Sequence, residues 1–187
     1  MFPQLRLRQA ADILIVGGVV AYPTESVFGL GCDPMNAAAV ARINAIKGRS
    51  VNAGFILLAS DKTQLAPYLA AGSDIASEVQ ESWPGPVSWV MPASSQTPPW
   101  ITGNRDTIAV RVTAHPLAAA LCSAFGGAIV STSANRSGRA AARSVLQVRR
   151  RFGSTLDYIL PGDTGKEALP SEIRDSRSGA VLRPGCK

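Results

Sequence analysis

The sequence predicts an α/β fold: a single-domain α/β sandwich with a twisted, mostly mixed central sheet. Short apolar runs rich in β-branched residues, typical of buried strands, alternate along the chain with segments whose apolar residues recur at helical spacing. In addition, no repeat, low-complexity linker or shift in composition divides the 187 residues. We therefore expect one domain over residues 1–187, long enough to bury most of its apolar surface.

The first elements are two helices with a strand between them. Apolar residues at helical spacing predict a helix over Leu5–Val16, and a strand follows at Val19–Tyr22. Asn36 is expected to cap a second helix, Ala37–Lys47, which Gly48 ends.

The second helix carries a lysine in an unusual place. Val40, Ile43 and Lys47 share one stripe, so Lys47 lies at the end of an apolar surface that faces the sheet. A charge that served only solubility would face water.

The rest of the chain continues the alternation of helices and strands. Helical segments are expected at Asp61–Leu69, Ser73–Ser82, Leu117–Phe125 behind Pro116, and from the Ser144 cap to Phe152. Strands are expected at Phe55–Ala59, Val87–Met91, Asp106–Val112, Ala128–Ser131, near Tyr158–Leu160 and at Ala180–Leu182, with a Pro-rich loop over Ser94–Asn104.

Three of the apolar runs end in small hydroxyl or cationic residues. Val19–Tyr22 leads into Pro23–Ser26, Ile108–Val110 ends at Arg111, and Ala128–Val130 leads into the run 131–138. Ligands of α/β sheets bind in the crevice beyond the strand ends. We therefore expect several strand ends to converge on one polar, anion-binding site.

The composition is that of a globular cytoplasmic protein. Hydrophobic residues make up 46% and charged residues 17%, with no run long enough to span a membrane and no signal-peptide core at the N-terminus. Cys32, Cys122 and Cys186 are far apart and lack a metal-site spacing, so reduced thiols are expected rather than disulfides or zinc.

The net charge of +6 comes mostly from arginine, with 15 Arg against 4 Lys. The guanidinium fork matches pairs of phosphate or carboxylate oxygens. Six arginines and no acid fall between Arg136 and Arg151. Two interpretations of this segment stand: a basic face for nucleotide or nucleic acid, and a solvated helix surface.

Several familiar catalytic devices are absent from the sequence. It has no GxxxxGK[ST] phosphate loop, and Gly29-Leu30-Gly31 is interpreted as turn glycine. The single histidine, His115, precedes a proline at a helix start and is interpreted as a cap, which makes a Ser-His-Asp triad improbable.

What remains is a set of cations and hydroxyls. Lys47-Gly48-Arg49 could grip one polyphosphate, although lysine also suits a helix C-terminus. Arg111, inside an apolar strand, must be paired or point at a ligand. Ser131, Ser133 and Asn135 could bind a ligand or form a local hydroxyl turn only.

Five motifs in order resemble those of one family. They are Pro23-Thr24-Glu25-Ser26-Val27-Phe28-Gly29-Leu30, Lys47-Gly48-Arg49, Ser133-Ala134-Asn135 with Ser137-Gly138, Ser171-Glu172-Ile173-Arg174-Asp175, and Leu182-Arg183-Pro184-Gly185. Over about residues 5–185 the chain resembles the YrdC/TsaC family of threonylcarbamoyl-AMP synthases. It is similar to the short bacterial form, so no extra C-terminal domain is expected.

The resemblance implies a reaction and its partners. L-Threonine, bicarbonate or CO2, and ATP with Mg2+ would give threonylcarbamoyl-adenylate and diphosphate, and a downstream threonylcarbamoyl-transferase complex would modify the tRNA adenosine next to the anticodon. By resemblance, threonine would be held by Thr24, Arg111, Ser131 and Ser171. ATP or the developing carbamoyl-phosphate link would be held by Lys47, Arg49, Thr107, Ser133, Asn135 and Arg183, with Lys47, Arg49, Ser133 and Asn135 as the catalytic set. The metal ligands are not indicated.

Two departures from the family pattern concern one stretch. Long-form members carry Asn-Pro-Leu and then a histidine after the KxR motif, where this chain has Ala53-Gly54-Phe55-Ile56-Leu57-Leu58. Part of the substrate contact set must therefore come from elsewhere.

The chemistry suits the residues. Threonine's amine would attack CO2 and the carbamate would attack the α-phosphorus of ATP, a task that needs fixed cations and oriented donors more than a strong base. Two alternatives are a non-catalytic RNA-binding module, resting on the Arg136–Arg151 segment, and another ATP-using adenylate former. Only 6% of the residues are aromatic, so the chain has few side chains on which RNA bases could stack, which weakens the RNA-binding alternative.

Overall fold

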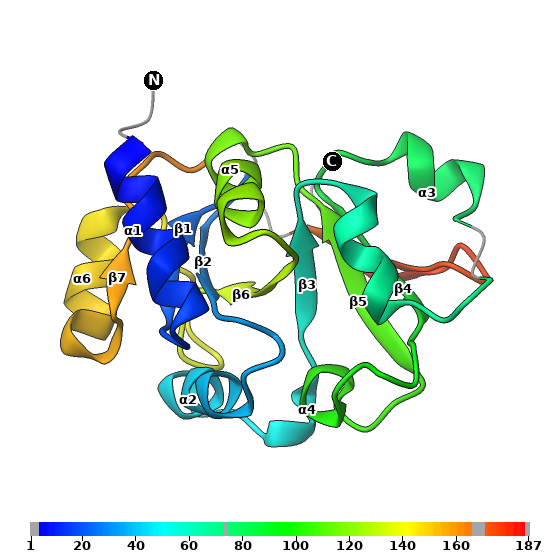
Figure 1. Ribbon diagram of the computed structural model, residues 1–187, viewed down its shortest axis with the longest axis horizontal. Coiled ribbons are helices and arrows are strands. Elements are labelled where there is room, and N and C mark those ends of the chain that lie inside the picture. The colour runs from blue at the N-terminus through cyan, green and yellow to red at the C-terminus, as the bar shows by residue number, and fades with distance from the viewer. Residues whose placement is uncertain (1–3, 73–74, 166–170, 186–187) are drawn as a thin grey trace.

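The computed structural model describes residues 4–72, 75–165 and 171–185, and its centre is one mixed sheet (Figure 1). The strands of the described residues are β1 Val20–Pro23, β2 Phe28–Gly31, β3 Ile56–Ala59, β4 Val87–Pro92, β5 Thr107–Val112, β6 Ile129–Ser133, β7 Tyr158–Ile159, β8 Glu172–Asp175 and β9 Val181–Arg183. They lie in the order β7-β1-β2-β6-β3-β5-β4-β8-β9. The predicted mixed sheet is confirmed, because β3 and β5 are parallel while β6 is antiparallel to both of its neighbours.

Helices cover both faces of this sheet. They are α1 Gln4–Ile15, α2 Ala37–Lys47, α3 Ser77–Glu81, α4 Pro99–Thr102, α5 Pro116–Phe125 and α6 Val145–Phe152, with 3-10 turns at Val51–Ala53, Lys62–Tyr68 and Gly153–Thr155. On β1, Val20 and Tyr22 pack under α1 and α5, while Ala21 between them packs with α6. Figure 1 shows α1 and α5 side by side in front of the strands.

The α5 layer covers only part of its face of the sheet. Ile129 of β6 and Leu58 of β3 are register partners buried in the α5 cluster. One pair further along the same face, Ser131 and Ile56 have no helix above them and line a cavity. The uncovered part of the sheet is where the site lies.

The predicted helix caps are confirmed. Asn36 Oδ1 accepts the Ala39 N–H at 3.0 Å, and Gly48 ends α2 in the left-handed region with φ 61°. His115 caps α5 through the Ala118 N–H, and Ser144 caps α6.

The interpretation of Gly29-Leu30-Gly31 as a turn is wrong. The segment is strand β2, in which Gly29 faces Tyr22 and Gly31 faces Val20. A Cβ on Gly31 would come within 2.8 Å of the Tyr22 ring and one on Gly29 within 3.1 Å. The glycines make room for a buried aromatic ring, which is why a strand carries them.

Other differences are local. Strand β8 was not expected, the Asp61–Leu69 helix is a 3-10 turn, and a short helix, α4, interrupts the expected loop over Ser94–Asn104. Of the helix expected over Ser73–Ser82, residues 73–74 lie outside the described residues and only Ser77–Glu81 is helical.

Candidate functional site

A cavity of about 880 Å³ lies on the uncovered face of the sheet. One row of register partners crosses five strands along its floor: Ser131, Ile56, Ala109, Val90 and Asp175. The expected convergence is confirmed, since Thr24, Arg111 and Ser131 all line this cavity, but the reason given for it, a crevice beyond the strand ends, is wrong. Antiparallel neighbours place opposite ends side by side, and the site instead uses alternate residues that share one face.

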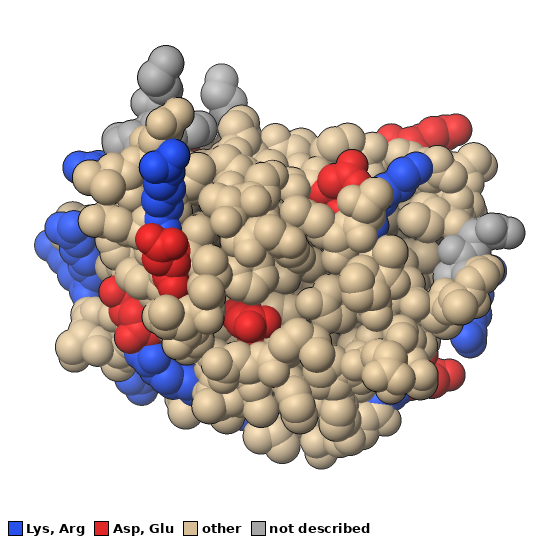
Figure 2. All heavy atoms as spheres, viewed as in Figure 1, with Lys and Arg blue, Asp and Glu red and all other residues tan. Residues whose placement is uncertain are grey.

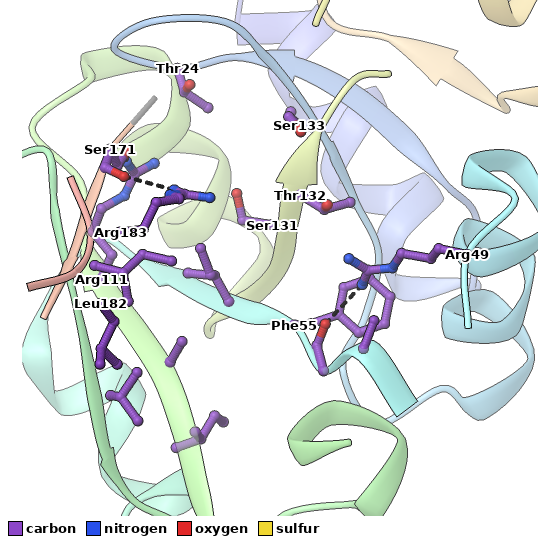
Figure 3. Close-up of a pocket in the computed structure, with 18 of the residues that line it drawn as sticks. Thr24, Arg49, Phe55, Arg111, Ser131, Thr132, Ser133, Ser171, Leu182 and Arg183 are labelled. Carbon is purple, nitrogen blue, oxygen red and sulfur yellow. Dashed lines mark hydrogen bonds between the residues drawn. The ribbon is translucent and has the colours of Figure 1, made fainter. Parts of the chain in front are cut away.

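Nine of the ten site residues predicted from the sequence line this one cavity. They are Thr24, Arg49, Thr107, Arg111, Ser131, Ser133, Asn135, Ser171 and Arg183. Lys47 is the exception. Figure 3 shows that Arg49 and Arg111 reach toward the cavity from opposite sides, with Ser131 between them.

One side of the cavity, the α2–β6 wall, consists of Arg49, Ser133 and Asn135. Arg49 follows α2, and its Nε donates to Asn44 Oδ1 at 2.9 Å while Nη2 donates to the Gly54 carbonyl at 2.9 Å. Its guanidinium carbon lies 3.9 Å from the centre of the Phe55 ring. Among the described residues, neutral groups orient this cation and no carboxylate forms an ion pair with it.

Lys47 lies behind this wall, as its place on the apolar stripe predicted. Its ammonium donates to the Ser133 carbonyl at 2.6 Å, the Asn135 carbonyl at 2.9 Å and Asn135 Oδ1 at 3.1 Å. An ammonium has three hydrogens, so each one has an acceptor within the protein. Lys47 is 5% exposed and fixes the end of β6 from behind.

The side chains of Ser133 and Asn135 are also held. Ser133 Oγ donates to Asn135 Oδ1 at 2.6 Å, and the Asn135 amide donates to the carbonyls of Arg136 and Arg139. The local hydroxyl turn left open by the sequence is therefore present, and both residues line the cavity as well.

Burial changes the titration of the cations in this region. Burial, and secondarily the nearby Arg49 charge, lowers the pKa of Lys47 to about 8. Burial also lowers the pKa of Arg49 to about 10. Both shifts have the direction expected of cations removed from water without a carboxylate partner.

The opposite side, the β5–β8 wall, consists of Arg111, Ser171 and Arg183. Arg111 donates through Nη1 to the Ser171 hydroxyl, and Arg183 Nη2 donates to the Ser171 carbonyl at 2.7 Å (Figure 3). Burial, followed by the charge of Arg111, lowers the pKa of Arg183. Ser171 is thus held from both sides by guanidinium groups.

Behind the β5–β8 wall lies a buried acid, Glu25. Its Oε2 is 3.3 Å from Arg111 Nη2, and its Oε1 accepts from Thr113 Oγ1 at 2.7 Å and from the Ala114 N–H at 3.1 Å. The sequence required either a partner or a ligand for Arg111, and the structure supplies the partner while leaving the guanidinium at the cavity.

Three charged residues near the cavity were not predicted. Arg105 and Asp175 line it, and Glu25 lies behind it. Arg139, which also lines it, belongs to the basic segment that the sequence analysis singled out. Glu25 and Asp175 are part of motifs that the sequence analysis singled out, but Arg105 stands outside them. Five arginines and one aspartate line the cavity within the described residues, so it attracts anions.

The stretch that departs from the family pattern forms the end of the cavity next to Arg49. Ala53, Gly54, Phe55 and Ile56 line it, whereas Leu57 and Leu58 are buried in the core. The backbone of Gly54 and the ring of Phe55 orient Arg49 here, so this stretch acts by supporting a cation.

The basic segment lies beside the cavity. A smaller hollow of about 320 Å³ is lined by Arg136, Arg139, Ala140, Arg151 and Phe152, and Arg139 and Ala140 line the large cavity as well. Arg151 Nη1 donates to the Ala140 carbonyl at 2.5 Å. Figure 2 shows Lys and Arg atoms gathered along the margin of the molecule where α6 lies.

The cysteines and the acidic residues offer no second candidate site among the described residues. Cys32 and Cys122 are free and buried, and burial raises the pKa of both thiols, that of Cys122 to about 12. Cys186 lies outside the described residues. Within the described part of the chain, no group of three His, Cys, Asp or Glu side chains is arranged to hold a metal ion. The same part has no helix long and apolar enough to cross a membrane.

Comparison with families and named sequences gives a consistent picture. The family model Sua5_yciO_yrdC, described as telomere recombination, matches residues 12–185. A Nitrosococcus oceani protein named threonylcarbamoyl-AMP synthase is 60% identical over 182 residues, 97% of this chain and 98% of the relative. A Halorhodospira halophila protein of the same name is 61% identical over 179 residues, 95% of this chain and 94% of the relative.

Solved structures agree in fold. P. abyssi Sua5 complexed with L-threonine superimposes with a TM-score of 0.91 and 32% identity over 99% of this chain and 55% of that one. This chain thus spans slightly more than half the length of that Sua5. E. coli YciO gives a TM-score of 0.82 and 27% identity over 97% of this chain and 90% of its own.

Proposed function

The chain belongs to the Sua5/YciO/YrdC family, and we propose that it is a threonylcarbamoyl-AMP synthase. The enzyme condenses L-threonine, bicarbonate or CO2, and ATP into threonylcarbamoyl-adenylate and diphosphate. The product serves formation of N6-threonylcarbamoyladenosine in tRNA. The observation that carries this proposal is one anion-attracting cavity with separate cationic walls, large enough for a nucleotide and an amino acid together.

The two walls suit the two larger substrates. We assign ATP to Arg49, Ser133, Asn135 and Thr107, with Lys47 supporting the wall from behind, and threonine to Thr24, Arg111, Ser131 and Ser171. Arg183 contacts Ser171 and would meet the carbamoyl-phosphate link, which adjoins the threonine part of the product. P. abyssi Sua5, solved with L-threonine, supports threonine as a ligand of this fold.

The reaction requires that the carbamate of threonine and the α-phosphate of ATP be held in line with each other. Threonine's amine attacks CO2 and loses a proton, which leaves a carbamate. A carbamate oxygen then attacks the α-phosphorus of ATP while the bond to the diphosphate breaks. The cations of both walls stabilise the charge that develops, and their fixed side chains need no rearrangement during the step.

The metal and the RNA are further parts of the proposal. We propose that Mg2+ arrives bound to ATP, whose phosphate oxygens supply its ligands. The segment from Arg136 to Arg151 would make a weak, sequence-independent contact with tRNA, because it adjoins the cavity and carries no acid. A threonylcarbamoyl-transferase complex would accept the adenylate. We place this synthase in the cytoplasm and propose that residues 1–187 form one domain.

Release of diphosphate from ATP tests this function. Release is expected only when L-threonine and bicarbonate are both present, and equal release without threonine would contradict the assignment. Serine should react more slowly, since one missing methyl group is worth roughly 1–3 kcal/mol of discrimination. The assay also separates the synthase from an RNA-binding module, which releases none, and from an adenylate former that uses another acid.

A further inference from the structure

Glu25 occupies a position that the reaction described so far does not use. It lies in the turn between β1 and β2, and its neighbours Thr24 and Ser26 both line the cavity. The Glu25 side chain turns away from the cavity and is 10% exposed. An acid in such a place must be compensated, because burying an unpaired carboxylate is costly.

The compensation links two separate segments. Oε1 accepts hydrogen bonds from Thr113 Oγ1 and the Ala114 N–H, just beyond the end of β5, while Oε2 faces Arg111 within β5. The contact with Arg111 is an ion pair at 3.3 Å that lacks hydrogen-bond geometry, so charge alone holds it. The carboxylate therefore ties the turn that carries Thr24 to the strand that carries Arg111.

Arg111 has few other partners. Its side chain is 6% exposed and its Nη1 donates to Ser171, while its Nε has no hydrogen-bond partner among the described residues. Without Glu25, the guanidinium would be oriented by one hydroxyl and would carry an uncompensated buried charge. The orientation that Arg111 presents to the cavity is thus set largely from behind.

We propose that Glu25 is a positioning residue, which fixes Arg111 and the Thr24–Ser26 turn in the geometry that receives the carboxylate and hydroxyl of the amino-acid substrate. This inference rests on the proposed function. Glu25 touches no substrate itself. Within the described residues its side chain contacts Arg111, Thr113 and Ala114 and does not contact the α2–β6 wall, so the effect is expected on threonine rather than on ATP.

The test compares four variants in the diphosphate-release assay and in direct binding of L-threonine and ATP by calorimetry. Glu25→Gln keeps the shape and removes the charge. Thr113→Val removes a donor to the carboxylate, and Thr113→Ser keeps it. Glu78→Gln makes the same change as E25Q in a mostly exposed acid on α3.

A split between the substrates is expected. Glu25→Gln should raise the threonine KM and Kd by roughly 10- to 100-fold, because the buried Arg111 guanidinium loses the charge that compensates it. The ATP KM and Kd should change by less than about threefold. Thr113→Val should shift threonine binding in the same direction by a smaller factor, and T113S and E78Q should match the wild type.

Other results would contradict the positioning role of Glu25. Equal losses for threonine and ATP, or a lower melting temperature with unchanged threonine binding, would mean that Glu25 only stabilises the fold. If E25Q does not fold, an unchanged threonine Kd in T113V would overturn the proposal. A wild-type protein that binds threonine but releases no diphosphate would refute the synthase function, while selective loss of threonine binding in E25Q would still support the role of Glu25.

Discussion

The two walls of the cavity have the same plan and opposite charges behind them. On each wall a buried ionic side chain lies behind the residues that line the cavity: Lys47 behind the α2–β6 wall and Glu25 behind the β5–β8 wall. Lys47 adds a positive charge to that of Arg49, whereas Glu25 offsets that of Arg111. ATP is strongly anionic and threonine is a zwitterion, so we assign ATP to the wall with the larger net positive charge.

One fold thus orients the cations of its two walls in two different ways. Where the charge is uncompensated, neutral carbonyls, an amide and an aromatic ring must orient the cations, and burial lowers the pKa of both Lys47 and Arg49. Where a carboxylate compensates the charge, recognition depends on geometry.

Removal of a cation from the α2–β6 wall should have the largest effect. Lys47→Ala or Arg49→Ala is expected to lower turnover by about 100-fold or more, since one preorganised charge-stabilising group is worth about 3 kcal/mol. Diphosphate release measures the loss. The exposed Lys62→Ala is the matched control for the lysine. A K47A protein with a lower melting temperature and normal turnover would reduce Lys47 to a helix-end residue.

Raising the pH should weaken the α2–β6 wall first. The pKa of Lys47 is lowered to about 8, so its proton is lost as the pH rises through that value, together with one of three hydrogen bonds to Ser133 and Asn135. ATP affinity, measured without threonine or bicarbonate, should fall above about pH 8, and the fall should be absent in Lys47→Met. An ATP affinity that is flat up to pH 10 would contradict this.

Added salt should weaken ATP binding more than threonine binding, by a smaller factor than the loss of a cation does. Added salt screens uncompensated charge, with a screening length of about 10 Å at 0.1 M. ATP binding should therefore weaken between low and moderate ionic strength, while binding of zwitterionic threonine next to the Arg111–Glu25 pair changes little. Calorimetry in a chloride series measures both. Equal salt dependence for the two ligands would remove the distinction between the walls.

The smallest effect on catalysis is expected outside both walls. Arg149→Gln with Arg150→Gln should flatten the salt dependence of tRNA binding, by a slope of roughly 0.7 to 0.9 per lost phosphate contact. Diphosphate release should remain nearly unchanged. Arg151 is left intact because it holds the Ala140 carbonyl. If tRNA binding keeps its slope, or is undetectable at low salt, the basic segment is a solvated surface.

The sequence was most informative where a local rule decides the structure. Caps and periodicity located α2 and α5, and the stripe ending in Lys47 gave the direction of that side chain. Strand β2 was missed because its glycines serve the ring of Tyr22, a contact made only after the sheet forms. Strand β8 was missed because a short, charged strand near the sheet edge has no apolar alternation.

The site shows the same division. Residues whose chemistry is conspicuous, such as Arg111 in an apolar strand, were found from the sequence. The row from Ser131 to Asp175 could not be found, because it depends on the register of five strands. Glu25 was missed as a functional residue because only the folded chain places Thr113 and Arg111 around its carboxylate.

The most direct test of the two-wall account is a pair of single variants measured against both ligands. Arg49→Gln alters the α2–β6 wall and Ser171→Ala alters the β5–β8 wall, and calorimetry gives the ATP and L-threonine affinities of each. The account predicts that R49Q loses ATP affinity by roughly tenfold or more and keeps threonine binding, while S171A does the reverse. Loss of both ligands in both variants, or the exchanged pattern, would contradict it.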